Sequence, residues 1–183
     1  MKRIFFLLWM SIAFMHVAKA QIFFTKNGMI SFFSKSPLEN ISAVNNQVVS
    51  VINTTTGEIK FSVIIKGFLF KKALMQEHFN ENYMESDKYP KATLNGTITD
   101  ISKVDFSKDG DYAVNMDGDL VVHGVTKKIT TPAVIAVRAG KFAATSSFMV
   151  LLADYNISIP KIVENNISKS IEIKVNCNFE PKS

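Results

Sequence analysis

Strict alternation of apolar and polar residues near the end of the chain is the feature that most limits its fold. Between Ser168 and Phe179 one apolar set alternates with one polar set: Ile171, Ile173, Val175, Cys177 and Phe179 against Ser170, Glu172, Lys174, Asn176 and Asn178. Successive side chains of a β-strand point to opposite faces, so this period of two predicts a strand with one buried and one wet face.

Eight segments carry this alternation in whole or in part, and turn sequences separate most of them. We expect strands near residues 28–35, 48–53, 58–70, 92–99, 112–122, 129–137, 142–152 and 168–179. Gly118 predicts a bulge or bend, and Pro132 predicts an edge, a bulge or a gap in the hydrogen-bond ladder. The chain is therefore all-β and antiparallel, either a barrel or a sandwich. Closure into a barrel removes unpaired edges.

One short amphipathic helix interrupts the strands, at about residues 71–83 of the segment KKALMQEHFNENYMESDKYP. Helical spacing places five residues on one face: Leu74, Met75, His78, Phe79 and Asn82. The apolar stripe of a lone helix among strands has to be buried, so we expect this helix to cap one end of the barrel. Pro90 ends the segment, because proline cannot continue a helix.

Residues 1–20 have the three parts of a secretory signal peptide. Two basic residues precede the apolar run Ile4–Val17, and Ala18-Lys19-Ala20 fits a cleavage site. The run is short for a membrane span, which needs about 20 residues. We therefore expect cleavage after Ala20, one domain over 21–183, a periplasmic or secreted location, and no integral membrane anchor.

Charge and cysteine content narrow the expected partners. Loss of residues 1–20 lowers the formal charge from +5 to +2, because that segment holds three basic residues and no acidic one. The sequence has no basic stripe with interleaved aromatic residues, so nucleic acid is not an expected partner. Cys177 is the single cysteine, and its place in the alternation predicts a small buried hydrophobe without a disulfide. The sequence leaves open whether two chains form a homodimer.

Several motifs together resemble the YceI family. They are MQEHFNENYMESDKYP at 75–90, KATLNG at 91–96, TGEI at 56–59 and GDLVVHGVTK at 118–127, in the family's order of elements. The resemblance extends over residues 28–179. It implies an exported bacterial protein with an eight-stranded lipocalin-like barrel, whose elongated apolar cavity takes a polyisoprenoid or other amphipathic lipid. The family has no established catalytic residues to carry over.

Alternation and resemblance together give a candidate ligand-binding set. The inward strand positions are Phe61, Val63, Ile65, Leu94, Ile98, Val114, Met116, Leu120, Val122, Phe142, Phe148, Ile171 and Ile173. Met75, Phe79 and Met84 near the helix are lid candidates, since methionine adapts to irregular apolar ligands. His78 is a candidate for hydrogen bonding to a head group. The alternative for each inward residue is a solid core.

Catalytic and metal chemistry find little support in the sequence. His78 and Glu81 lie one helical turn apart, but no motif supplies a third metal ligand. The segment 105–116 begins like a calcium loop but has Met116 where a bidentate glutamate is needed. We therefore expect a lipid-binding protein without catalytic residues, metal or cofactor. The alternatives are an enzyme acting on an isoprenoid lipid and a structural envelope partner without a ligand.

Overall fold

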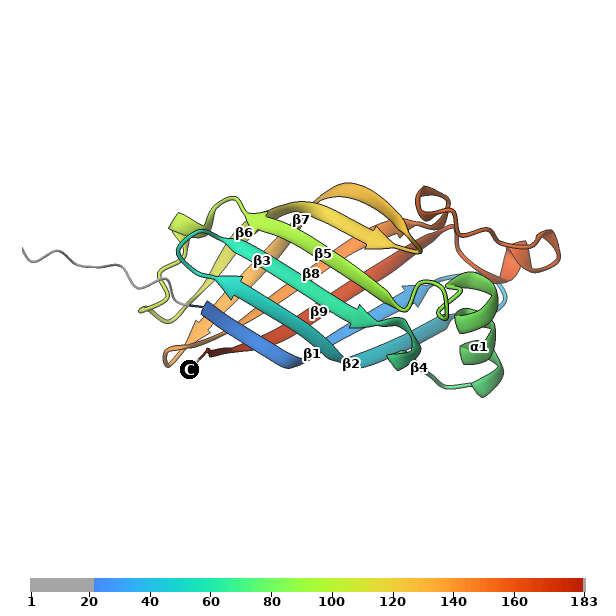
Figure 1. The fold of residues 1–183 in the computed structure, drawn as a ribbon, viewed down its shortest axis with the longest axis horizontal. Helices are drawn as coiled ribbons and strands as arrows, with labels where there is room; N and C mark the ends of the chain where they lie inside the picture. Colours follow the sequence, from blue (N-terminus) through green and yellow to red (C-terminus); the bar gives the residue numbers. More distant parts are fainter. Residues whose placement is uncertain (1–21, 183) are drawn as a thin grey trace, which may run out of the picture.

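Eight long strands follow one another around a closed barrel in the computed structural model, which describes residues 22–182 (Figure 1). They are β1 Ile22–Ser34, β2 Ile41–Asn53, β3 Glu58–Ile64, β5 Lys91–Ile98, β6 Gly110–Val122, β7 Val125–Arg138, β8 Lys141–Leu151 and β9 Ser170–Pro181. Successive long strands pair antiparallel, and β1 pairs with both β2 and β9, which closes the barrel. The expected eight-stranded antiparallel lipocalin-like barrel is confirmed. The expected signal peptide, residues 1–20, lies outside the described residues.

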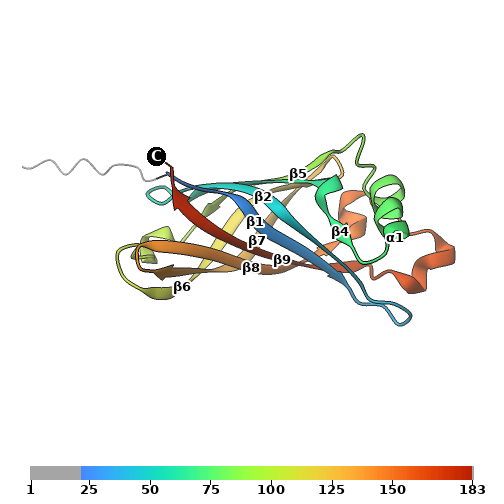
Figure 2. The same ribbon diagram turned by 90° about the horizontal axis from the view of Figure 1, so that it is seen from below.

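The helical segments gather at one end of the barrel, which we call the helix end (Figures 1 and 2). They are α1 Ala73–His78, the π-helical turn η2 Phe79–Tyr83, and the 3-10 segments η4 Leu152–Tyr155 and η5 Lys161–Asn166. The C-terminus and the short segment η3 Ile101–Lys103 lie toward the other end, which we call the packed end. The expected cap on one end is confirmed.

The helix turns only part of the expected face inward. Met75 and Phe79 are half-buried, but Leu74, His78 and Asn82 are exposed. The Phe79 ring packs against three phenylalanine rings of the barrel, at centroid distances of 5.0 to 5.6 Å. This aromatic contact decides which side of the two-turn helix faces the barrel, and the wider stripe read from the spacing is wrong.

The strand expected over 58–70 is shorter. β3 ends at Ile64, and η1 Ile65–Gly67 leads into the two-residue strand β4 Leu69–Phe70, which pairs with β2. The fully buried Asn45 side chain donates a hydrogen bond from Nδ2 to the Ile64 carbonyl oxygen at 2.9 Å. A Cβ on Gly67 would lie 2.7 Å from that Nδ2, so the chain can turn over the amide because a glycine stands there.

The two irregularities expected in the sheet have different outcomes. Gly118 forms no bulge, because it pairs in regular register with Gly96 on one side and Ile129 on the other. A Cβ on Gly118 would lie 2.9 Å from the Gly96 Cα, so the glycines allow close strand contact instead. Pro132 does lie at a gap in the ladder: pairing between β7 and β8 begins at Ala133, and the preceding part of β7 pairs with β6 alone.

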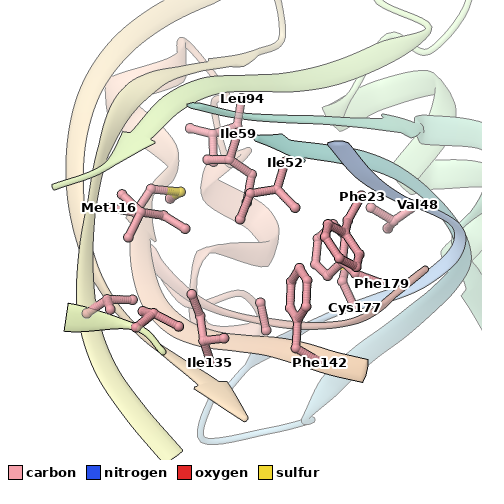
Figure 3. Packing of buried hydrophobic residues seen from close by; sticks show 14 of the residues in the cluster. Phe23, Val48, Ile52, Ile59, Leu94, Met116, Ile135, Phe142, Cys177 and Phe179 are labelled. Atoms are coloured by element: carbon pink, nitrogen blue, oxygen red, sulfur yellow. The ribbon is translucent and has the colours of Figure 1, made fainter. Parts of the chain in front are cut away.

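Aromatic rings fill the packed end. The Phe142 ring lies 4.9 Å from Phe23, 5.1 Å from Phe106 and 5.1 Å from Phe179, which stacks on it. Figure 3 shows Phe23, Phe142, Phe179 and Cys177 lying together inside the barrel. Phe179 and Cys177 are 1 % and 0 % exposed, and none of these four residues lines the cavity described below.

Candidate functional site

Between the packed end and α1 the barrel is hollow. The cavity has a volume of about 360 Å³, within the range of small-molecule sites. All eight long strands contribute side chains to its wall, and α1, η2 and the connection from β8 to β9 close over it. Figure 3 shows Leu94, Met116 and Ile135 pointing inward from different parts of the wall. The strand alternation thus places apolar side chains around a space rather than into a continuous core.

Fifteen of the seventeen residues singled out from the sequence line this cavity. They are Phe61, Val63, Ile65, Met75, His78, Phe79, Met84, Leu94, Ile98, Met116, Leu120, Val122, Phe148, Ile171 and Ile173. Val114 and Phe142 do not line it, because both lie on the parts of β6 and β8 that belong to the packed end. Contact between the fifteen residues and a ligand stays a prediction.

Four phenylalanine rings form a lid at the helix end. Phe79 of η2 packs on Phe32 of β1 at 5.4 Å, and Phe68 and Phe70 complete the cluster. The Gln76 side chain accepts a hydrogen bond from the Phe70 backbone nitrogen at 3.2 Å. Ring packing and this neutral hydrogen bond thus hold the four rings together, and the ion pair of Lys72 with Glu39 beside them is exposed.

Polar groups on the cavity wall gather mainly at the helix end. Ser34, Glu39, His78, Tyr83 and Asn166 all come from segments at or beside this end. Glu39 forms an ion pair with Lys72. The Tyr83 hydroxyl is protonated at pH 7, and burial raises its pKa further. An apolar chamber with polar groups at one end suits a molecule with a long apolar tail and a polar head.

Sequence comparison decides the family. The YceI-like domain matches residues 12–179. The chain belongs to the YceI-like family. The resemblance read from the sequence motifs is therefore confirmed, and the barrel with its chamber is the form this YceI-like chain takes. No curated protein sequence matches the chain.

Solved structures share the fold of this YceI-like protein. A polyisoprenoid binding domain from Saccharophagus degradans, implicated in plant cell wall breakdown, has a TM-score of 0.77 and 15% identity, covering 90% of this chain and 100% of that one. Burkholderia cenocepacia BcnA has a TM-score of 0.68 and 13% identity, over 84% and 96%. The Campylobacter jejuni YCEI protein has 0.51 and 16%, over 81% and 85%. At these identities the likeness shows the fold.

The two histidines of the described YceI-like domain have different surroundings. His78 lies on the cavity wall with an exposed side chain, but His123 does not line the cavity. The His123 Nδ1 lies 3.0 Å from the Tyr155 carbonyl oxygen, which can only accept, so Nδ1 carries the proton. Its Nε2 is 3.6 Å from a Glu85 oxygen, and the Tyr89 ring packs on it at 4.6 Å. His123 therefore contacts η4 through this hydrogen bond and the segment after the lid through the Tyr89 ring.

Several wall residues were missed from the sequence. Ile30 and Phe32 come from β1, and Ile157, Val163 and Ile167 come from the connection between β8 and β9. Ile30 and Phe32 follow the alternation of inward and outward positions, but Phe33 obscures it because an apolar residue occupies an outward position. The last three lie in irregular and 3-10 segments, where no period marks an inward residue. Ile135, Ala144 and Val150 also line the cavity, and the alternation of β7 and β8 carried their signal.

Metal-binding geometry is not found in the described part of the YceI-like chain. Within residues 22–182 no three His, Cys, Asp or Glu side chains come together as a metal site. The calcium-like segment forms a turn, in which Asp105 accepts hydrogen bonds from the Ser107 backbone nitrogen and hydroxyl at 2.9 and 2.6 Å. These bonds lower the pKa of Asp105.

None of the helices within residues 22–182 is both long and apolar enough to cross a bilayer.

Proposed function

We propose that this protein is an exported lipid carrier that holds a polyisoprenoid or similar amphipathic lipid in the barrel. The observation that carries the proposal is the apolar chamber with its polar groups gathered at the helix end. The fold shared with a polyisoprenoid binding domain supports the same ligand class. Export, to the periplasm or out of the cell, rests on the signal-peptide pattern in residues 1–20.

The energetics favour a tail inside the chamber. Each CH₂ group removed from water contributes about 0.8 kcal/mol, so a tail of several isoprene units gains a large free energy on entry. The entropy lost when the tail is fixed in one conformation, and when the lipid loses its free translation and rotation, offsets much of that gain. Binding then depends on the shape of the chamber, and polar groups such as Tyr83 and Asn166 select the head group.

Filling the chamber tests the proposal. Ala92 is a half-buried residue on the cavity wall, whereas Ala113 points outward from β6 and is exposed. We expect Ala92→Trp to weaken binding of a fluorescent isoprenyl lipid analogue by about tenfold or more, because the indole takes the place of the tail. Ala113→Trp is the matched control, and its affinity should equal that of the wild type.

A smaller substitution separates lost binding from lost folding. Ala133 also lies on the wall, and Ala133→Leu adds less volume than a tryptophan. Circular dichroism and thermal melting establish whether each variant is folded. If folded Ala92→Trp and Ala133→Leu bind the analogue as the wild type does, the chamber is not the lipid site. Chemical change of the analogue on incubation would instead support the enzyme alternative.

A further inference from the structure

The most exposed large hydrophobic side chains of the described chain all lie at the helix end. Ile162 of η5 is 93% exposed, Leu38 of the β1–β2 turn 72%, Leu74 of α1 62% and Leu69 of β4 61%. Figure 2 shows the β1–β2 turn, α1 and η5 projecting at this same end. Single exposed leucines are ordinary, but four on separate segments around one cavity form a pattern.

Each of these side chains is next to a residue of the cavity wall. Leu69 is followed by Phe70, and Leu74 is followed by Met75; both second residues line the cavity. In the same way, Val163 lines the cavity beside the exposed Ile162. The four exposed side chains therefore come from the same segments that supply wall residues at the helix end of the chamber.

Lysines without an ion pair flank these side chains. Within residues 22–182, Lys35, Lys71 and Lys161 are exposed and form no ion pair, whereas Lys66, Lys72, Lys88 and Lys169 at this end are all paired. Lys35 precedes Leu38 by three residues, Lys71 lies between the two exposed leucines of β4 and α1, and Lys161 adjoins Ile162. Such cations complement anionic lipid phosphates.

We infer that the helix end of the barrel docks onto a lipid bilayer. The four exposed side chains, which we call the rim residues, enter the interfacial region, and the unpaired Lys35, Lys71 and Lys161 face the phosphate groups. Glu77 of α1 and Glu81 of η2 are also exposed there, so apolar insertion supplies more of the attraction than charge does. If the proposed carrier function holds, a tail could pass between bilayer and chamber without crossing water.

Vesicle sedimentation tests the docking surface. The probes are vesicles of phosphatidylcholine alone and of phosphatidylcholine with phosphatidylglycerol. We expect Leu74→Ser with Ile162→Ser to lower the partition coefficient by about tenfold. The matched control is Val49→Ser with Val134→Ser, two exposed residues of the barrel wall that are 45% and 40% exposed, and it should bind as the wild type does. Replacing Lys35, Lys71 and Lys161 by glutamine should remove the preference for anionic vesicles.

Three results would overturn the inference. The first is a wild type that sediments with neither vesicle, and the second is an equal loss of binding in Leu74→Ser with Ile162→Ser and in the control Val49→Ser with Val134→Ser. The third is a wild-type dimer that Leu74→Ser with Ile162→Ser dissociates in analytical ultracentrifugation. The last result would assign the rim residues to a second copy of the chain. Binding of the isoprenyl analogue in solution without vesicles is measured in parallel. A wild-type protein that docks onto vesicles but does not bind the analogue contradicts only the carrier function. A wild-type protein that binds the analogue but does not dock onto vesicles contradicts only the docking.

Discussion

The two halves of the barrel are built from the same strands, yet one is solid and the other is hollow. At the packed end the inward positions carry aromatic rings, and Phe142 contacts three others. In the hollow half several inward positions carry small residues, including Ala92, Ala133 and Ser146. Alternation within each regular stretch therefore determines which side chains point inward, and the small residues among them leave room in the hollow half.

The largest expected difference between the halves is the cost of removing a ring. We expect Phe179→Ala at the packed end to lower the free energy of unfolding by about 3–5 kcal/mol, because it leaves a cavity among fully packed neighbours. Phe148→Ala on the cavity wall should cost less than about 1.5 kcal/mol, because its ring already faces space. Urea denaturation measures both, and equal losses would remove the distinction.

Adding volume should give a contrast in the same direction at a smaller scale, with the packed end again the more sensitive. A Cβ on Gly28 would lie 2.6 Å from the Cys177 Sγ and 3.1 Å from the Val48 Cβ. We expect Gly28→Ala to cost about 1–3 kcal/mol of unfolding free energy, whereas Ala92→Val adds methyl groups to open space and costs little. Thermal melting of both single variants makes the comparison. If the hollow half were in fact filled, Ala92→Val would destabilise the protein as much as Gly28→Ala does.

The smallest expected effect is a pH dependence at the packed end. Burial raises the pKa of the Cys177 thiol from 9.0 to about 12, so the folded chain holds the proton that the unfolded chain releases. The resulting stability is present below pH 9 and is lost as the pH rises toward 12. Between pH 8 and pH 10 we expect a loss of about 1 kcal/mol that Cys177→Ala does not show. Equal slopes for the two proteins would mean that water reaches the thiol.

Irregular strands explain part of what the sequence did not reveal. The inward residues of β1 change parity between Thr25 and Gly28, and the pairing of β1 with β2 shifts register there. In β2 the parity changes between Asn45 and Val48. Each bulge breaks the period of two, so only the part of each strand after the bulge was recognised. By contrast β9 keeps one parity throughout, and its prediction needed no correction.

The helix end shows a second limit. Its residues lie on a short helix, a π-helical turn and 3-10 segments, where no single period relates sequence to burial. The contact of Phe79 with the rings of Phe32, Phe68 and Phe70 sets the orientation of the helix. These rings come from distant parts of the chain, so local spacing could not identify the inward face. Most strand positions of the site were accessible to sequence reasoning, whereas those of the connection between β8 and β9 were not.

Native mass spectrometry of the protein purified gently from the cells that make it tests the central claim most directly. We expect a bound mass that extracts into organic solvent as a long-tailed amphipathic lipid. Ala92→Trp should lack this mass, and Ala113→Trp should retain it, because only the first substitution fills the chamber. A wild-type chain that carries no lipid under conditions that preserve other protein–lipid complexes, or a lipid that remains bound to Ala92→Trp, would contradict the account.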